Sequence, residues 1–434
     1  MTENNNLIVN KSRALIGRIQ VPGDKSISHR SIILGSVAQG SLSIRNFLHC
    51  DDCLNTISAM RQLGVNITVE KQEITITGKG LFGLTEPKKI IDVGNSGTLI
   101  RLLTGVLSTQ KFRSSLTGDS SLRSRPMDRI IKPLRNCGAD IDSDEFKAPL
   151  KINPKIEFSS IEYGQKIASA QIKSCLILAA LFIEGKHVFY EKIPTRDHTE
   201  NLLQHFGYDL KRSENELVML GQQKLIAKDI EIPSDISSAA FFIVAALISE
   251  GSDILIPNVN INKYRTGIIT VLKQMKAKID LKNIRTVSNE KIADIEVKYS
   301  KLESINMGGD IISSLIDELP ILFIACAVSE GISNISGIEE LRYKESDRIK
   351  SMEDGLKAIG VNVSSTLDSI KIIGGEITGG KVKSYDDHRI AMSFAIAGIV
   401  SKKSITISDT KNISTSFPNF VDLLRQQEVN VYEI

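Results

Sequence analysis

Basic and hydroxyl side chains gather where apolar helices are predicted to begin. The segment DKSISHR carries Lys25, Ser26 and Arg30 at one such start. The first turn of a helix presents unpaired backbone N–H groups at the positive end of its dipole, and both favour anions. Arg makes bidentate contacts to phosphate and carboxylate groups, and Lys supplies a point charge. The pattern therefore predicts a binding site for anionic ligands.

Further segments repeat this pattern. The candidates at the starts of other apolar helices are Asn95, Gly97, Arg101, Ser169, Gln171, His388 and Arg389. A second set is predicted to begin the outer helices and comprises Arg123, Arg125, Arg196, Lys344, Glu345 and Arg348. Ser and Asn are common helix caps, so capping is the simpler interpretation for Ser26, Asn95 or Ser169 taken singly. Basic residues are mildly unfavourable at helix N-termini, so their recurrence favours anionic ligands.

Two carboxylates lie among these bases. Asp317 directly precedes an apolar helix in SLIDELP, so we expect it to be partly buried, either as a helix cap or as a base. Glu345 lies between Lys344 and Arg348, where an ion pair is the alternative to a catalytic role. The segment GNSGT is not a Walker loop, the complete motif GxxxxGK[ST] does not occur, and neither GxSxG nor HExxH is present. What remains is acid–base chemistry between two anionic substrates held by Lys and Arg.

Composition limits the classes of function. Apolar residues make up 41% and charged residues 24%, as in soluble globular proteins. A net charge of +3 and the absence of Trp give no argument for nucleic acid or a membrane surface. No apolar stretch is long enough for a membrane span, and the start MTENNNLIVNKSR has no signal or transit pattern. The expected location is the cytoplasm.

The five cysteines are few and odd in number, which indicates a reducing compartment. Two of them, Cys50 and Cys53, form a CxxC pair beside His49. A single such pair is a weak indicator of metal binding or redox chemistry. The alternative is that Cys53 faces the core side of the helix that follows.

The elements that must position these residues recur with a period of about 70 residues. Six times the chain gives a polar start, an apolar helix, a strand, an amphipathic helix and two strands. The amphipathic helix has apolar residues at helical spacing and ends at a C′ glycine, as with Leu54, Ile57, Met60, Leu63 and Gly64. The apolar helices are predicted to be buried on all sides.

Six repeats are too many for one core, so we expect two lobes of three repeats each. The predicted lobes are residues 23–233 with repeats 1–3, and residues 1–22 plus 234–434 with repeats 4–6. The strand Ala14–Val21 and the segment 231–235 would be the two crossovers. Two extended links favour hinge closure around a ligand, so the active site is expected in the cleft between the lobes.

The motifs, in this order, resemble the 5-enolpyruvylshikimate-3-phosphate synthase (EPSP synthase) family. The matching segments are VPGDKSISHR, GNSGTLIRL, SLRSRP, SAQIKS, RDHTE, IDELP, LRYKESDRI, DDHRIAMSF and TSFPNF, spread over residues 21–420. The spellings SAQIKS, RDHTE and DELP are similar to those of the divergent bacterial class. The resemblance implies an α/β, two-lobed enolpyruvyl transferase fold of six βαβαββ units, three per lobe. We expect the chain to act as a monomer.

The resemblance also implies a reaction. The enolpyruvyl group of phosphoenolpyruvate moves to the 5-hydroxyl of shikimate 3-phosphate through a tetrahedral intermediate, phosphate leaves, and no metal or cofactor is needed. By resemblance Asp317 is the base, Glu345 carries the proton at the methylene carbon, and Lys25 assists. The implied shikimate 3-phosphate contacts are Lys25, Ser26, Arg30, Ser169, Gln171, Arg196, Asp317 and Lys344. The implied phosphoenolpyruvate contacts are Lys25, Asn95, Gly97, Arg125, Gln171, Arg348, His388 and Arg389.

Two positions depart from the family pattern. Ala170 stands where better-known members have a Ser, and Thr415 precedes SFP where many members have a Lys.

Three alternative functions fit the residues less well. UDP-N-acetylglucosamine enolpyruvyl transferase typically has a reactive Cys in the loop 118–126, where Ser120 stands here. A pseudo-symmetric clamp on nucleic acid would need a broad basic face. A catalytically inactive relative is disfavoured because the acids and bases are all present.

Overall fold

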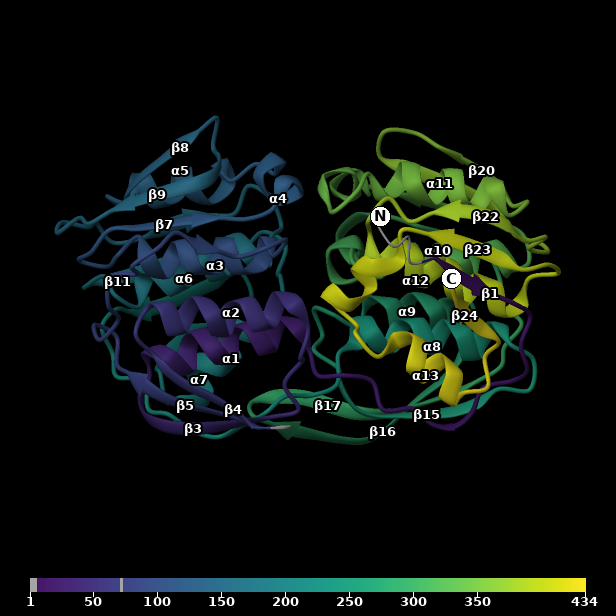
Figure 1. The fold of residues 1–434 in the computed structure, drawn as a ribbon, viewed down its shortest axis with the longest axis horizontal. Coiled ribbons are helices and arrows are strands. Elements are labelled where there is room, and N and C mark those ends of the chain that lie inside the picture. Colours follow the sequence, from purple (N-terminus) through teal and green to yellow (C-terminus); the bar gives the residue numbers. More distant parts are fainter. Residues whose placement is uncertain (1–5, 71–72) are drawn as a thin grey trace. The chain divides into compact units, whose positions relative to one another are not determined.

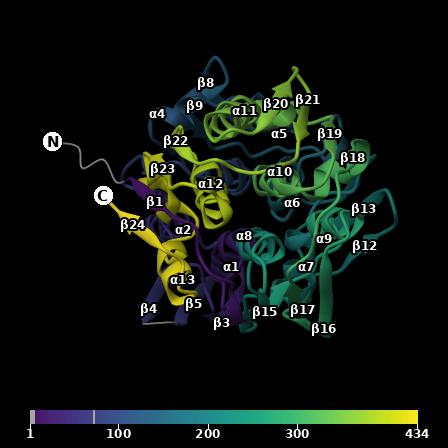
Figure 2. The same cartoon turned by 90° about the vertical axis from the view of Figure 1, so that its right-hand side faces the viewer.

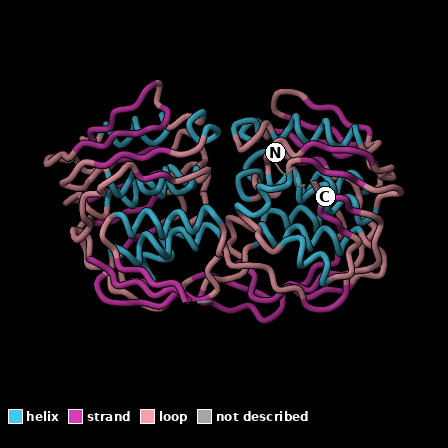
Figure 3. Tube along the Cα trace, viewed as in Figure 1, coloured by secondary structure: helices cyan, strands magenta, loops and turns pink. Residues whose placement is uncertain are grey.

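The computed structural model describes residues 6–70 and 73–434, which divide into two compact units. The N-terminal lobe comprises Gly23–Pro233 together with Thr286–Glu290. The C-terminal lobe comprises the residues up to Pro22, Ser234–Arg285 and Lys291–Ile434. In each lobe the helices lie inside and the strands form the outer layer (Figure 3).

The N-terminal lobe holds the first three repeats (Figure 1). The first repeat contains α1 (Lys25–Val37), β3 (Gln39–Arg45), α2 (Asp51–Gln62), β4 (Asn66–Glu70) and β5 (Glu73–Lys79). The second contains β6 (Ile91–Asp92), α3 (Gly97–Leu107), β7 (Ser114–Thr117), α4 (Ser120–Ser124), α5 (Asp128–Asn136), β8 (Asp140–Asp144) and β9 (Lys147–Asn153). The third contains β10 (Glu162–Gly164), α6 (Ala170–Ala180), β11 (Lys186–Tyr190), α7 (His198–His205), β12 (Leu210–Arg212) and β13 (Glu216–Leu220), and β14 (Ile230–Glu231) follows it.

The C-terminal lobe begins with β1 (Leu7–Val9) and β2 (Ile16–Arg18). The fourth repeat then contains α8 (Ile236–Ile248), β15 (Asp253–Asn260), α9 (Gly267–Gln274), β16 (Lys278–Val287) and β17 (Glu290–Lys298). The fifth contains β18 (Asn306–Met307), η1 (Gly309–Ser314), α10 (Leu319–Val328), β19 (Ile332–Ser336), η2 (Glu339–Tyr343), α11 (Arg348–Ala358), β20 (Asn362–Ser365) and β21 (Ser369–Ile373). The sixth contains β22 (Gly380–Lys383), α12 (His388–Val400), β23 (Ile405–Ser408), η3 (Thr410–Thr415), α13 (Phe420–Gln426) and β24 (Val431–Glu433).

The described strands form six four-stranded sheets, one per repeat, and the predicted repeat architecture is confirmed. In the second repeat the order is β6-β7-β9-β8, with β6 parallel to β7 and the other pairs antiparallel. Three strands come from elsewhere in the chain. β14 pairs in parallel with β3 in the first sheet, and β2 pairs in parallel with β15 in the fourth. In the sixth sheet β1 pairs antiparallel with β23. Each lobe thus contains at least one sheet with a strand that is distant in sequence from the other three.

The apolar helices form the centre of each lobe, as predicted. In the C-terminal lobe α8, α10 and α12 pack on one another, and Figure 2 shows them surrounded by the other elements of that lobe. Every residue of α8 from Ile236 to Leu247 is buried. Small residues allow this packing. In the N-terminal lobe a Cβ at Gly105 of α3 would lie 2.1 Å from the Cys175 carbonyl oxygen of α6, so only Gly fits there.

The lobe boundaries differ from the prediction in two respects. First, residues 286–290, the tip of the β16–β17 hairpin, group with the N-terminal lobe. The Glu290 carboxylate accepts a hydrogen bond from Asn201 Nδ2 and lies 2.8 Å from His198 Nδ1, and both residues belong to the N-terminal lobe. Second, most of Ala14–Val21 is not a crossover, because β2 pairs with β15. The chain passes between lobes at Pro22–Gly23 and Pro233–Ser234, and again on either side of residues 286–290.

Candidate active site

Lys25 is the first residue of α1, and a carboxylate from α2 holds its side chain. Its Nζ lies 2.5 Å from Asp52 Oδ2. Burial lowers the pKa of Lys25, but Asp52 outweighs this effect and the pKa lies above its usual value. The ammonium side chain is half-buried and 22% exposed. A charged Lys is thus fixed at the start of a helix. The interpretation of Ser26 as the helix cap was wrong, because Asp24 accepts the hydrogen bond from the Ile27 N–H.

Arg30 is buried one turn further along α1, and all three of its nitrogens donate to protein oxygens. The acceptors are Thr199 Oγ1 at 2.8 Å, the Ser26 carbonyl at 2.9 Å and Ser174 Oγ at 2.8 Å. Burial lowers the pKa of Arg30 to about 10, which leaves it charged at neutral pH. Since the residue is only 3% exposed, its direct effect is to join α1, α6 and α7.

Arg125 belongs to a second group, at the start of α3. Its Nη2 donates to Asn95 Oδ1 at 2.7 Å and to Ser121 Oγ at 3.2 Å. Both partners are neutral, and the buried Nε has no hydrogen-bond partner among the described residues. Gly97 lies beneath this guanidinium, because a Cβ at Gly97 would be 3.2 Å from Arg125 Nη1. The group therefore presents a half-buried cation without an opposing carboxylate in the part of the chain that the structure describes.

Gln171 joins this group through Arg101, a candidate from the sequence that was not assigned to either substrate. Arg101 Nη1 donates to Gln171 Oε1, and Gln171 Nε2 donates to Thr98 Oγ1 at 3.0 Å. Ser169 caps α6, because its side chain accepts a hydrogen bond from the Ile172 N–H. The interpretation of Ser169 as a helix cap is therefore confirmed. Asn95 is not a cap, since Ser96 takes that role for α3. Ala170, the departure from the family pattern, is the first residue of α6.

Arg196 lies in the segment between β11 and α7, and its charge contributes to the lowered pKa of Arg30. A buried ion cluster holds this segment. Lys173 Nζ of α6 lies 3.0 Å from Glu191 and 2.8 Å from Glu200, and it donates to the Thr195 carbonyl at 3.2 Å. Arg196 therefore directly follows Thr195, whose carbonyl is held by the buried Lys173.

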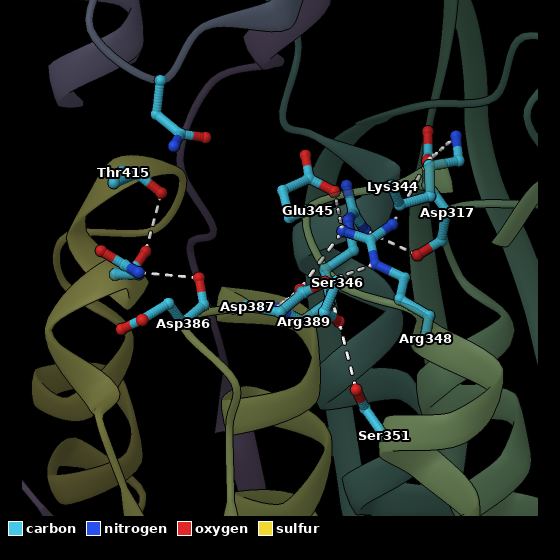
Figure 4. A network of polar contacts seen from close by, with 12 residues as sticks. Asp317, Lys344, Glu345, Ser346, Arg348, Ser351, Asp386, Asp387, Arg389 and Thr415 are labelled. Carbon is cyan, nitrogen blue, oxygen red and sulfur yellow. Dashed lines mark hydrogen bonds and ion pairs between the residues drawn. The ribbon is translucent and has the colours of Figure 1, made fainter. Parts of the chain in front are cut away.

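In the C-terminal lobe the candidate residues converge on Arg348, the first residue of α11 (Figure 4). Its Nε lies 2.8 Å from Asp387 Oδ2, its Nη2 lies 2.6 Å from Glu345 Oε2, and its Nη1 lies 3.8 Å from Asp317 Oδ1. Burial alone would lower the pKa of Arg348, but Asp387 and Glu345 raise it above its usual value. One buried cation thus positions three carboxylates.

Asp317 lies between two further cations. Lys344 Nζ is 3.2 Å from Asp317 Oδ1, and Arg389 Nη1 donates to the Asp317 carbonyl at 2.8 Å (Figure 4). The side chain is 15% exposed, so the predicted partial burial is confirmed. Asp317 does not cap α10, whose N-cap residue is Glu318 without a side-chain cap bond. Of the two roles left open by the sequence, the cap is therefore excluded.

The start of α12 supplies the remaining members. Asp387 is the N-cap, is fully buried, and accepts from the Arg389 N–H at 2.9 Å. Its burial favours a higher pKa, but the Arg348 guanidinium outweighs this and lowers it. His388 is 6% exposed. Thr415, the second departure from the family pattern, donates to the Asn412 carbonyl at the end of η3.

The predicted residues therefore form two groups, one in each lobe. The N-terminal group is Lys25, Ser26, Arg30, Asn95, Gly97, Arg125, Ser169, Gln171 and Arg196, and the C-terminal group is Asp317, Lys344, Glu345, Arg348, His388 and Arg389. The predicted catalytic residues and substrate contacts did not include Asp52, Arg101 or Asp387. Asp387 could have been found in the DDHR segment because Asp is a common helix cap, whereas the pairing of Asp52 with Lys25 depends on the packing of α2 on α1.

Two negative findings apply to the described residues. No described helix is long and apolar enough to cross a membrane. Across residues 6–70 and 73–434, no group of three or more His, Cys, Asp or Glu side chains is arranged to hold a metal ion.

Known proteins resemble this chain over nearly all of its length. The family model for EPSP synthase (3-phosphoshikimate 1-carboxyvinyltransferase) matches residues 9–424. The 3-phosphoshikimate 1-carboxyvinyltransferase of Hydrogenovibrio crunogenus is 46% identical over 99% of both chains, and that of Coxiella burnetii is 47% identical over 97% of this chain and 96% of its own. The structure of EPSP synthase from Acinetobacter baumannii has a TM-score of 0.90 at 45% identity and covers 99% of this chain and 100% of its own.

Proposed function

Because the chain belongs to the EPSP synthase family, we propose that it transfers the enolpyruvyl group of phosphoenolpyruvate to the 5-hydroxyl of shikimate 3-phosphate and releases phosphate. This is a step of the shikimate pathway, which leads to aromatic amino acids. The observation that carries the proposal at the site is the cluster at Arg348. There, two half-buried carboxylates, Asp317 and Glu345, flank one buried guanidinium.

The reaction needs a base and a proton carrier at different atoms. The 5-hydroxyl must lose its proton as it attacks C2 of phosphoenolpyruvate, and the methylene carbon must gain one. Asp317 is proposed as the base, and Glu345 as the acid that protonates the methylene carbon and later takes the proton back as phosphate leaves. Arg348 keeps both carboxylates in place, and placement of reacting groups lowers the barrier.

The N-terminal group is proposed to bind the anionic parts of the substrates. Arg125 is suited to the phosphoenolpyruvate side, since its present partners are both neutral and an anion would supply the missing countercharge. Arg196, Ser26 and Ser169 are proposed for shikimate 3-phosphate. Arg30 and Arg348 donate mainly to protein groups, so they support neighbours that touch substrate.

Lys25 is proposed to stabilise charge at the bridging oxygen during addition and elimination. Its ion pair with Asp52 fixes the ammonium group before substrate arrives, and a preorganised charge costs no reorientation at the transition state. The proposal requires both groups of residues to act on the same pair of substrates. All of them come from one chain, so a monomer is sufficient.

The test is phosphate release from phosphoenolpyruvate, measured separately with shikimate 3-phosphate and with UDP-N-acetylglucosamine as acceptor. Release only with shikimate 3-phosphate, with the enolpyruvyl product identified by mass spectrometry, is expected. Release only with UDP-N-acetylglucosamine would assign the chain to the sister reaction. Release with neither, from a sample shown to be folded by its cooperative unfolding, would refute the proposed function.

A further inference from the structure

The start of α2 carries two thiols beside the Lys25–Asp52 ion pair. Cys50 is the N-cap of α2, in extended conformation, and Cys53 is the third residue of the helix. Side chains at these two positions face one another, as the reciprocal contacts of a capping box show. Both residues are buried, at 1% and 0% exposure, and both are free thiols. The predicted burial of Cys53 is confirmed, but burial alone does not account for a second thiol facing it.

The two thiols differ in their readiness to ionise. The hydrogen bond from the Cys53 thiol, with Lys25 nearby, lowers the pKa of Cys50. Burial raises the pKa of Cys53. Burial also raises the pKa of the other three cysteines. It raises the pKa of Cys137 to about 11 and that of Cys326 to about 12, and it raises the pKa of Cys175 as well. Since the thiolate is the nucleophile, Cys50 is the attacking sulfur and Cys53 the resolving one.

We propose that Cys50 and Cys53 are an oxidative modification site, at which a small peroxide closes a disulfide that lowers turnover by displacing Asp52 from Lys25. The Cys50 thiolate attacks one peroxide oxygen and becomes a sulfenic acid, and hydroxide leaves and takes up a proton to form water. The Cys53 thiol then attacks the sulfenic sulfur and a second water leaves. In total, two thiols and one hydrogen peroxide give one disulfide and two waters. A small oxidant is required because both sulfurs are buried.

The link to Lys25 is geometric. The two thiols now contact one another through a hydrogen bond, whereas a disulfide fixes the two sulfurs about 2.05 Å apart. Closing the disulfide therefore draws the N-cap and the first turn of α2 together. Asp52 is in that turn, 2.5 Å from Lys25 Nζ, and Cys53 Sγ lies 3.9 Å from the Lys25 carbonyl oxygen. A displacement of about 1 Å at a reacting group costs up to about a hundredfold in rate, so we expect a loss of at least tenfold.

The experiment uses the purified full-length chain, first fully reduced and then treated with hydrogen peroxide. Proteolysis and mass spectrometry are expected to find a disulfide between Cys50 and Cys53, and turnover is expected to fall at least tenfold and to return with dithiothreitol. The variant Cys53→Ala should keep its turnover under peroxide. The matched control Cys326→Ala, which removes a buried thiol of the other lobe, should be inactivated like the wild type.

Three results would overturn the inference: no disulfide in the wild-type chain, a disulfide without loss of turnover, or equal inactivation of Cys53→Ala. The mapping of the wild-type disulfide does not depend on how any variant folds. The effect on turnover rests on the proposed role of Lys25, but the mass measurement needs no catalysis. Failure of the proposed function would appear separately, as no phosphate release by the reduced enzyme.

Discussion

Replacing Gly97 with Ala tests whether Arg125 binds phosphoenolpyruvate. Gly97 is the first residue of α3, and an added Cβ would lie 3.2 Å from Arg125 Nη1 and 3.8 Å from Arg101 Nη1. The Arg125 guanidinium must therefore move by a few tenths of an ångström. That movement strains its 2.7 Å hydrogen bond to Asn95 and shifts it from the position proposed for the substrate.

The magnitude follows from the strength of one charge-assisted hydrogen bond, about 1.5–3 kcal/mol. A displaced but still present guanidinium loses part of this, about 1 kcal/mol, so the KM for phosphoenolpyruvate should rise roughly fivefold. The free energy of unfolding should not fall, because Ala is up to about 1 kcal/mol more favourable than Gly in a helix. Weaker substrate binding in a chain of undiminished stability is the expected combination.

The assay is steady-state phosphate release at saturating shikimate 3-phosphate, with urea unfolding alongside. Gly164→Ala is the matched control, since its Cβ would meet no atom within 4 Å. A double-mutant cycle with Arg125→Ala isolates the mechanism, because Gly97→Ala should have no further effect once the guanidinium is gone. An unchanged KM in Gly97→Ala, or a fivefold effect that persists without Arg125, would refute the reasoning.

Three further predictions concern the carboxylates and a buried His. Asp317→Asn should lower kcat by about a hundredfold or more with an unchanged urea midpoint, and near-normal turnover would remove Asp317 as the base. Asp387→Asn should lower the free energy of unfolding in urea by about 3 kcal/mol, because it breaks the buried ion pair with Arg348, whose side chain is 1% exposed. A decrease in the free energy of unfolding below about 1 kcal/mol would contradict this prediction. Burial, with Lys25 and Arg30 nearby, holds the pKa of His29 well below its usual value, so below about pH 6.5 the unfolded chain binds a proton that the folded chain does not. The stability advantage of the wild type over His29→Gln should therefore shrink by about 2 kcal/mol between pH 7 and pH 5, and a constant difference would argue against a neutral buried His29.

The repeat architecture could be predicted because it depends on local pattern. Runs such as the one from Ile236 to Leu247 lack a polar face, so they must be buried, and the C′ glycines Gly64 and Gly360 ended amphipathic helices as expected, with φ of +86° at both. Leu54 was predicted to lie on the buried, apolar face of its helix but is 40% exposed. Helical spacing locates the edge of an apolar face only to within about one residue. The origin of β14 and β2 could not be predicted, since a strand of two or three residues carries no signal of its partner.

The capping interpretations show the same limit at the site. Ser169 caps its helix, whereas Ser26 and Asn95 were displaced from that role by Asp24 and Ser96. Each error was one or two residues along the chain. Propensity ranks the residue types, but the backbone conformation at the helix start decides which neighbour has the geometry of a cap.

The sequence by itself determined which residue types stand at the helix starts, and that these starts recur in a repeated scaffold. Only the tertiary structure decided their partners. Lys25 pairs with Asp52 of another helix, and Arg348 collects Asp317 and Asp387, which lie 70 residues apart in the chain. The physical reason is that a charge is a local property of a residue, whereas an ion pair requires two side chains within about 4 Å. That distance is set by how the buried helices pack.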